Sequence, residues 1–273
     1  MSNPRKTNFI AWWSLDEEGG TRADSHGSNN LTDQNTVLYG SGVQGNAADF
    51  ERSNIEGLEI TDNADLSFGD EDFTLFCWAK LESAVADMAL MSKFDAAVNT
   101  KEYYLYYDQS DDRFKFVVSN DGTSEASVIA DNLGSPSVDT WYFIVAWHDS
   151  VNNTINIQVN NGPEDSETYS SGCNDNTSKF ALGGRDHGAS GLDFYDGLLD
   201  EAGVTAEVWD ASERTWMFNH GSGRVYSDLD KLLPNIVRSI LSIIAPSVEV
   251  YDTRFKLRAR NRDTALTTRV RNE

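Results

Sequence analysis

The sequence has few of the residues from which many functional sites are built. Its 273 residues include only two cysteines and four histidines. Two cysteines are too few for a disulfide framework, so we expect Cys77 and Cys173 to be free thiols that pack as small apolar residues. The histidines lie far apart in sequence and lack the H-E-x-x-H spacing of zinc proteases. This content excludes a disulfide-rich protein and a zinc protease.

Long apolar runs are also missing. No uninterrupted apolar stretch reaches the roughly 18 residues that a membrane-spanning helix needs. Residues 1–12 are basic and lead directly into a strand-like run, without the apolar core of a signal peptide. We therefore expect no membrane span and no classical secretion signal. Release of a virus particle by lysis is one route out of a cell that needs neither.

Positive charge is scarce. The chain has 22 Lys and Arg against 44 Asp and Glu, which gives a formal net charge of −22. Such a field repels nucleic acid and anionic lipid, and it favours solubility and cation binding. We therefore expect no nucleic-acid partner. The surplus of acid fits both an ordinary acidic surface and a protein exposed to brine.

The sequence does contain a long series of short strand patterns. Residues 154–160 alternate apolar and polar side chains, with Ile155 and Ile157 on the face expected to be buried. Further strands are expected at residues 73–81, 103–107, 113–119, 141–147 and 193–205. One helical turn is expected over residues 212–218, with Ser212 as its N-cap. The pattern predicts an all-β fold of two antiparallel sheets.

Five motifs, taken in order, resemble those of laminin-G-like domains. They include W-W-S-L-D-E, G-N-A-A-D-F and G-L-L-D-E-A-G-V, and they lie at residues 12–32, 45–50, 73–80, 197–204 and 209–213. The resemblance covers residues 10–225. It implies a concanavalin A-like, two-sheet antiparallel jelly-roll sandwich, and it points to binding or assembly rather than catalysis.

Catalytic motifs are missing from this framework. Glycoside hydrolases of the superfamily resembled carry paired carboxylates as E-x-D-x-x-E or E-x-D-x-E, because one must act as acid and the other as nucleophile. Neither pattern occurs here, and no G-x-S-x-G elbow lies near a histidine. We therefore expect the protein not to be an enzyme, with a glycoside hydrolase or lyase as the less favoured alternative.

The resemblance also implies a structural Ca²⁺ site. Domains of this kind often hold one ion between the early D-S-x-G loop and the late D-E strand, which makes Asp24 and Asp200 the candidate ligands. The alternative is that Asp24 caps a turn and Asp200 accepts from backbone amides. A further acidic group, Asp108, Asp111 and Asp112, is expected to be a solvated turn.

Tyrosines cluster over residues 103–107. With a period of two, Tyr104 and Tyr106 share one face of the strand, and the other three residues share the opposite face, so one set lines the core. Tyr104 and Tyr106 are the candidates to stack on a sugar ring.

The composition changes near residue 228, which divides the chain into a jelly roll over residues 1–228 and an anchoring or oligomerisation extension over residues 229–273. Residues 231–273 hold nine Lys and Arg against four Asp and Glu, so this segment carries +5 and residues 1–230 carry −27.

The extension shows two patterns. Apolar residues at helical spacing over residues 229–245 predict an amphipathic helix that packs on protein rather than spanning a bilayer. Basic residues then alternate with apolar ones in two runs, which predicts a two-stranded basic ribbon that needs a partner for stability. The residues expected to carry assembly are Leu233, Ile236, Ile240, Phe255, Arg258, Arg260, Arg269 and Arg271.

The two-part organisation favours a non-enzymatic structural protein of a tailed-phage virion. It would be a capsid decoration or tail-associated protein that displays the jelly roll and is attached through the extension. Its expected partners are other virion proteins and further copies of itself, and its expected location is the virion. The alternative is a carbohydrate-binding, lectin-like protein outside the cell or at its surface, with a host-surface glycan as ligand.

Overall fold

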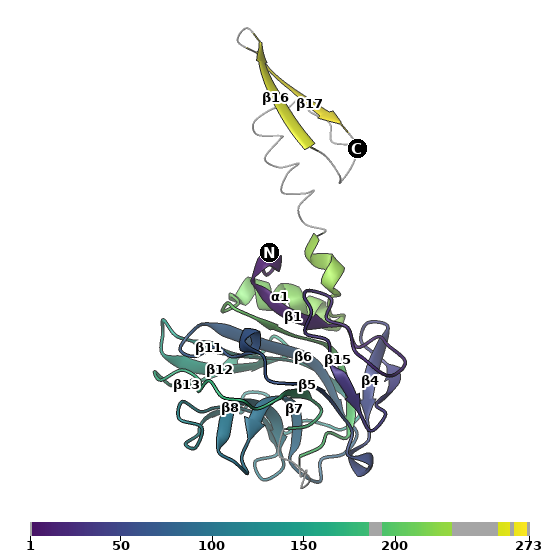
Figure 1. The fold of residues 1–273 in the computed structure, drawn as a ribbon, viewed down its shortest axis with the longest axis vertical. Helices are drawn as coiled ribbons and strands as arrows, with labels where there is room; N and C mark the ends of the chain where they lie inside the picture. The colour runs from purple at the N-terminus through teal and green to yellow at the C-terminus, as the bar shows by residue number, and fades with distance from the viewer. Residues whose placement is uncertain (1, 186–192, 231–255, 263–264, 272–273) are drawn as a thin grey trace. The chain divides into compact units, whose positions relative to one another are not determined.

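The computed structural model describes residues 2–185, 193–230, 256–262 and 265–271. The chain forms two compact units, Met1–Tyr226 and Ser227–Glu273. The first unit, called the body below, is a sandwich of two antiparallel sheets (Figure 1). This is the predicted all-β jelly-roll architecture.

One layer of the body is an eight-stranded sheet. Along it lie β13 (Glu164–Thr168), β12 (Thr154–Val159), β11 (Trp141–Asp149), β6 (Phe73–Leu81), β15 (Gly197–Thr205), β4 (Asn46–Phe50) and β3 (Leu38–Ser41), and β1 (Phe9–Trp13) also pairs with β15. The β11–β12 hairpin and strand β6 lie where the sequence predicts them.

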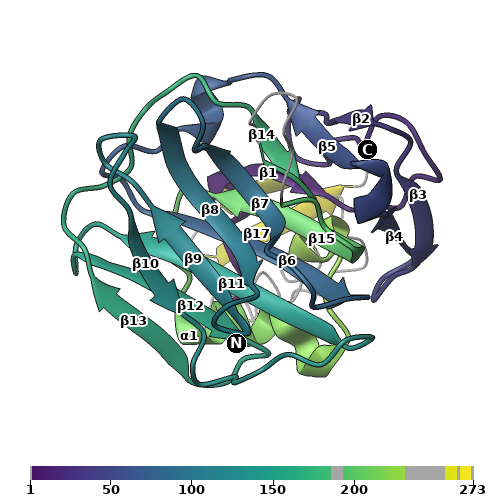
Figure 2. The ribbon, with the colours of Figure 1, turned by 90° about the horizontal axis from the view of Figure 1, so that it is seen from below.

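The other layer is a seven-stranded sheet, which faces the viewer in Figure 2. Its order is β10 (Ala126–Ile129), β9 (Arg113–Val118), β8 (Thr100–Asp108), β7 (Met88–Asp95), β14 (Phe180–Leu182), β5 (Gly57–Ile60) and β2 (Thr32–Gln34). Apart from one α-helix and a hairpin in the extension, the remaining described elements are short 3₁₀ segments at Lys6–Asn8, Arg52–Asn54, Ala64–Leu66, Asn219–Gly221 and Tyr226–Asp230.

The main core fills the space between the two sheets. Alternate residues of facing strands meet there, and Trp13 of β1 stacks on Phe180 of β14 with 5.0 Å between the ring centroids. Ile155 and Ile157 lie in this core, as the alternation of the strand predicts. Cys77 and Cys173 are buried and free, as expected.

The α-helix α1 (Ala211–Phe218) lies against the outer face of the eight-stranded sheet (Figure 1). Its N-cap is Asp210 and not the predicted Ser212, because the Asp210 carboxylate accepts from the amides of Ser212 and Glu213. Glu213 returns a bond by accepting from the Asp210 amide, which completes a capping box. The helix thus begins one residue before the sequence indicates.

The described part of the extension contains an antiparallel hairpin of β16 (Lys256–Arg262) and β17 (Ala265–Arg271). This is the predicted basic ribbon. The predicted helix lies mostly outside the described residues, and so do Leu233, Ile236, Ile240 and Phe255. Among the described residues, no helix is long and apolar enough to cross a membrane.

Candidate functional site

The outer face of the seven-stranded sheet carries a stack of three aromatic rings. Tyr104 and Tyr106 of β8 lie 4.2 Å apart between ring centroids and are nearly parallel, and Phe94 of β7 stacks on Tyr104 at 5.1 Å. Ala89 and Val117 complete this apolar cluster, which is separate from the main core. The period-two division of the tyrosines is therefore confirmed, since Tyr103, Leu105 and Tyr107 lie in the main core.

Charged groups border the stack near Tyr106. The Tyr106 hydroxyl donates to the Asp108 carboxylate at 2.9 Å, and Lys115 of β9 lies 3.0 Å from the same carboxylate and 3.1 Å from Asp111. Burial works against the ionised form of Asp108, but bonds from Ser110 and Lys115 outweigh it and lower the pKa of this carboxyl. Asp108 thus stays charged and buried.

A second charged border lies near Tyr104. Its hydroxyl donates to Asp193 at 2.9 Å, and Arg185 lies 2.8 Å from the same carboxylate. The Arg185 guanidinium also lies 5.5 Å from the Tyr104 ring centroid, a cation–π contact. The stack is thus held between two carboxylates, each paired with a cation.

The stacking leaves Tyr104 and Tyr106 little open ring surface on which a sugar could stack. Tyr104 is 3 % and Tyr106 9 % exposed, and each ring is stacked on its neighbour, so little ring face is open to a ligand. The accessible groups are at the Tyr106 border, where the side chains of Lys115 and Asp111 are 18 % and 39 % exposed. This border offers an ammonium donor and a carboxylate acceptor beside the edge of the tyrosine stack.

Asp24 is accounted for by the backbone around it. One carboxylate oxygen accepts from the amides of Trp12 and His26, and the other accepts from the amide of Asn29. These bonds fold the loop after β1, as the turn-capping alternative describes. Asp24 therefore has a structural role that does not need a metal ion.

Asp200 is satisfied on one side only. Its Oδ2 accepts from the amides of Val43 and Gln44 at 2.7 and 2.9 Å, and the Glu201 amide also favours the charged form. Oδ1 is buried and makes no hydrogen bond among the described residues. A Cβ at Gly42 would lie 2.7 Å from Oδ2, so glycine is required for the loop to wrap this carboxylate. Burial raises the pKa of Asp200 to about 7, and the charge of Asp16 adds to the rise.

A bulge in β15 places Asp200 and its neighbour in buried surroundings. The register of β15 against β6 shifts between Asp200 and Gly203, and Glu201 adopts a left-handed φ of 44°. Glu201 accepts a hydrogen bond from the Trp12 indole. The D-E pair of the late motif thus places two consecutive carboxylates inside the fold, which a regular strand would not do.

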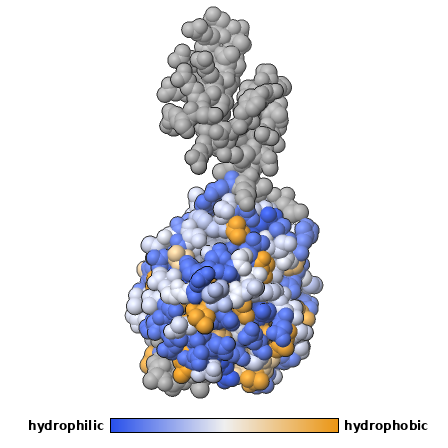
Figure 3. Space-filling view, turned by 90° about the vertical axis from the view of Figure 1, so that its right-hand side faces the viewer, coloured by the Kyte–Doolittle hydropathy of each residue, from blue (hydrophilic) through white to orange (hydrophobic). Residues whose placement is uncertain are grey.

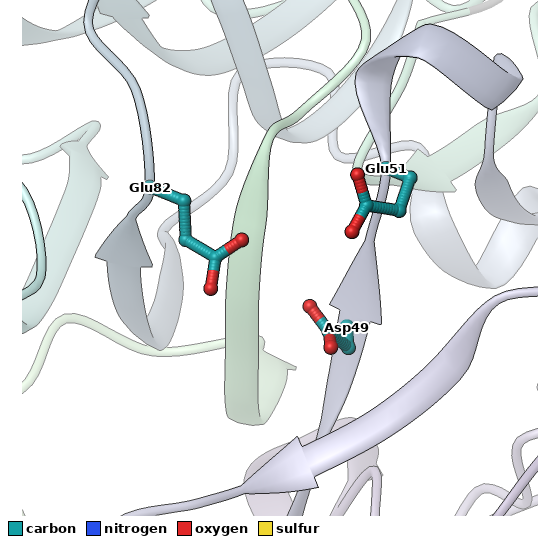
Figure 4. A group of neighbouring side chains, drawn as sticks. All are labelled: Asp49, Glu51 and Glu82. Carbon is teal, nitrogen blue, oxygen red and sulfur yellow. The ribbon is translucent and has the colours of Figure 1, made fainter.

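A further acidic group lies beside the first residues of β15, where Gly197 pairs with Phe50 and Leu81. Asp49, Glu51 and Glu82 each offer an oxygen within 4.8 Å of the others. Asp49 lies on β4 and Glu51 directly follows that strand, and β15 runs between them and Glu82 (Figure 4). Burial raises the pKa of Glu82, and the neighbouring charge of Asp49 adds to this. This trio, and no group containing Asp24 or Asp200, is the set of three carboxylates that could share a cation among the described residues.

No pattern in the sequence indicates this trio, because Glu82 comes close to Asp49 only through the strand order β6–β15–β4. The sequence pattern likewise does not identify Lys115 as a partner of the tyrosine stack. Its position opposite Tyr106 in the β8–β9 register is the signal that a correct strand pairing would have supplied.

Comparison with known proteins agrees with this architecture. Residues 54–213 match the laminin-G-like family described as the concanavalin A-like lectin/glucanases superfamily. The chain belongs to this superfamily. No curated protein sequence matches the chain.

Several solved structures share the fold of this superfamily member. The binding domain of Paraclostridial Mosquitocidal Protein 1 is 14 % identical with a TM-score of 0.61, over 78 % of this chain and 52 % of that chain. Domain 4 of AbnA, an extracellular GH43 arabinanase from Geobacillus stearothermophilus solved with arabinotriose, is 14 % identical with a TM-score of 0.54, over 80 % of this chain and 98 % of that one.

A third neighbour is a structure of botulinum neurotoxin type C, a toxin whose cell entry depends on interaction with two ganglioside molecules. It is 12 % identical with a TM-score of 0.58, over 78 % of this chain and 51 % of that chain. The chain thus spans about half the length of these two toxin structures. These likenesses establish the fold.

Proposed function

We propose that the body is a non-catalytic, lectin-like module that binds a glycan beside the tyrosine stack, on the outer face of the seven-stranded sheet. The observation that carries this proposal is the border formed by Tyr106, Asp108, Asp111 and Lys115. Membership of a lectin and glucanase superfamily supports the same class of ligand. So do the neighbour solved with arabinotriose and the neurotoxin whose cell entry depends on gangliosides.

The chemistry of the border suits sugar hydroxyls. Asp108 is used within the protein, where it fixes the Tyr106 hydroxyl and the Lys115 ammonium. Lys115 and Asp111 then offer a donor and an acceptor, and charge-assisted hydrogen bonds are stronger than neutral ones. The apolar edge of the tyrosine stack complements the C–H groups of a sugar ring.

The proposal is tested by a double substitution, Asp111→Ala with Lys115→Ala. The intact protein is screened on a glycan array, and the best ligand is measured by calorimetry. We expect the double variant to bind at least about tenfold more weakly, since a charge-assisted bond contributes roughly 1.5–3 kcal/mol.

Lys80→Ala is the matched control, because Lys80 also lies over an aromatic ring, that of Trp141, but on the other sheet. Its affinity should equal that of the wild type. Unchanged affinity in the double variant would place the glycan elsewhere, and the absence of any glycan ligand on the array would reject the lectin function.

We also propose that Ca²⁺ binds at Asp200 in a structural role. The support is the buried Oδ1 that lacks a partner, beside the charge of Asp16. Ca²⁺ takes oxygen ligands and would provide the counter-charge that this carboxylate lacks. Asp24 is not needed in this site, because backbone amides already occupy both of its oxygens.

A second candidate function, display on a virion, is favoured by the basic ribbon at the end of an acidic chain. In this proposal the body is exposed on a phage capsid or tail, and the extension attaches it. Protein that belongs to a particle should co-purify with it at a fixed copy number, and a chain without residues 231–273 should not be incorporated. Incorporation of that truncated chain at the wild-type copy number would contradict the proposal.

A further inference from the structure

The strand register of the ribbon separates its residues into two chemically different faces. Residues directly opposite one another in an antiparallel pair lie on the same face, as do residues two apart along a strand. One face holds the pairs Lys256 with Arg271, Arg258 with Arg269, Arg260 with Thr267 and Arg262 with Ala265. The other holds Leu257 with Val270, Ala259 with Thr268 and Asn261 with Leu266.

All six basic residues of the two strands therefore share one face. Two of the four pairs on that face, Lys256 with Arg271 and Arg258 with Arg269, place like charges directly opposite each other. Such pairs destabilise a sheet, and an isolated two-stranded ribbon is only marginally stable in water. An array of this kind is stabilised when an anionic surface neutralises it.

The anionic surface is present on every copy of the chain. Residues 1–230 carry −27, and on the side of the body in Figure 3 polar residues dominate while apolar ones are scattered. Guanidinium groups bind carboxylates through paired hydrogen bonds, and five of the six basic residues are arginines. Nucleic acid or an anionic membrane would be repelled by the same body that carries the ribbon.

We propose that the basic face of the β16–β17 ribbon docks on the acidic body of a second copy of this chain. The contact joins two different surfaces, so it is heterologous, and it closes into a ring or a reciprocal dimer when the geometry allows. The proposal does not depend on glycan binding, because it uses neither Lys115 nor Asp111.

The first test measures the mass of the full chain by sedimentation at low and high salt. At about 20 mM NaCl the wild type should form oligomers, and at about 500 mM NaCl it should dissociate, because the screening length falls several-fold. The variant Arg258→Glu with Arg269→Glu should be monomeric at both salt concentrations. The control, Arg5→Glu with Arg52→Glu, makes the same change in charge on the body and should behave as the wild type does.

The second test asks which surface the ribbon contacts. A tagged wild-type chain is mixed with the untagged Arg258→Glu/Arg269→Glu variant, whose ribbon is disabled but whose acidic body is intact. The wild type should capture the variant, whereas a tagged variant should not capture an untagged one. Circular dichroism confirms that the body of the variant is folded.

Three results would overturn the proposal. The first is a wild-type chain that stays monomeric at low salt, which would indicate a ribbon docked on its own body or left free. The second is a wild type that fails to capture the variant, which would indicate contacts between ribbons. The third is an Arg258→Glu/Arg269→Glu variant that still forms the oligomer at low salt.

Discussion

Asp200 is fully buried, and only one of its carboxylate oxygens accepts hydrogen bonds from the described residues. Its amide partners, Val43 and Gln44, stabilise the charged form, but burial outweighs them and raises the pKa to about 7. The residue therefore takes up a proton, or it binds a cation. Each alternative makes a prediction that a single substitution tests.

Without metal, the stability of the protein should depend on the protonation of Asp200. Its pKa rises from 3.8 in the unfolded chain to about 7 in the folded protein, so the folded state binds the proton more tightly. This contribution is complete below the unfolded pKa and is lost as the pH rises through about 7, an effect on the order of a few kcal/mol.

Urea unfolding in excess chelator between about pH 3 and pH 8 measures this effect across both pKa values. Asp200→Asn should flatten the decline relative to the wild type, and the exposed Glu18→Gln should leave it unchanged. Equal slopes in all three proteins would show that Asp200 is not the titrating group.

With Ca²⁺ present, the melting temperature of the wild type should rise. Binding to the native state at about 100 times the dissociation constant adds roughly 2.7 kcal/mol, which corresponds to a rise of about 5–10 °C for a body of this size. Asp200→Asn should lose most of this rise, whereas Glu82→Gln, in the carboxylate trio of Figure 4, should keep it. The reverse pattern would locate the ion at the trio.

Among the elements, α1 is hydrogen-bonded to two strands of the eight-stranded sheet through Arg214. Arg214 donates to Gln158 of β12, to Glu164 of β13 and to the Trp209 carbonyl, and its guanidinium lies 4.4 Å from the centroid of the Trp147 ring. These bonds need a planar group with several donors, which lysine does not have.

Arg214→Ala should therefore lower the free energy of unfolding by about 3 kcal/mol, because buried partners lose their bonds. Arg214→Lys should recover less than half of this loss, and Arg5→Lys, at an exposed position, should cost almost nothing. Chemical denaturation measures all three. A lysine variant as stable as the wild type would mean that charge alone holds the helix.

The elements also show what can be predicted from the sequence. The central strands β6, β11 and β12 were predicted closely, because long alternating runs report burial on one face directly. Short edge strands such as β2 and β3 were missed, since three or four mostly exposed residues carry no such pattern. The late strand starts at Gly197 rather than at residue 193, because pairing with β4 and β6 begins only there.

The candidate site was predictable only where neighbours in sequence form it. The division of Tyr104 and Tyr106 from Tyr103 and Tyr107 follows from the period of one strand. Lys115 comes from the next strand, and its contact with Asp108 depends on register, which alternation within one strand does not determine.

Over the whole molecule, electrostatic self-repulsion opposes folding. The chain carries −22, and residues 1–230, without the basic end, carry −27. A high net charge destabilises the compact state, and added salt screens the repulsion between exposed charges. The basic end carries +5, so it lowers the net charge of the whole chain and with it the overall repulsion.

Salt should therefore stabilise the truncated chain, residues 1–230, more than it stabilises the full chain. The truncated chain keeps both sheets and their core, so we expect it to fold as an all-β protein. Its free energy of unfolding should rise between about 20 and 500 mM NaCl, with a larger increase than in the full chain, because more uncompensated charge is screened.

Urea unfolding at the two salt concentrations, with circular dichroism as the signal, measures both increases. An equal increase in the two chains would mean that the ribbon charges do not reduce the repulsion within the acidic body, and dominant helix in the truncated chain would contradict the fold itself.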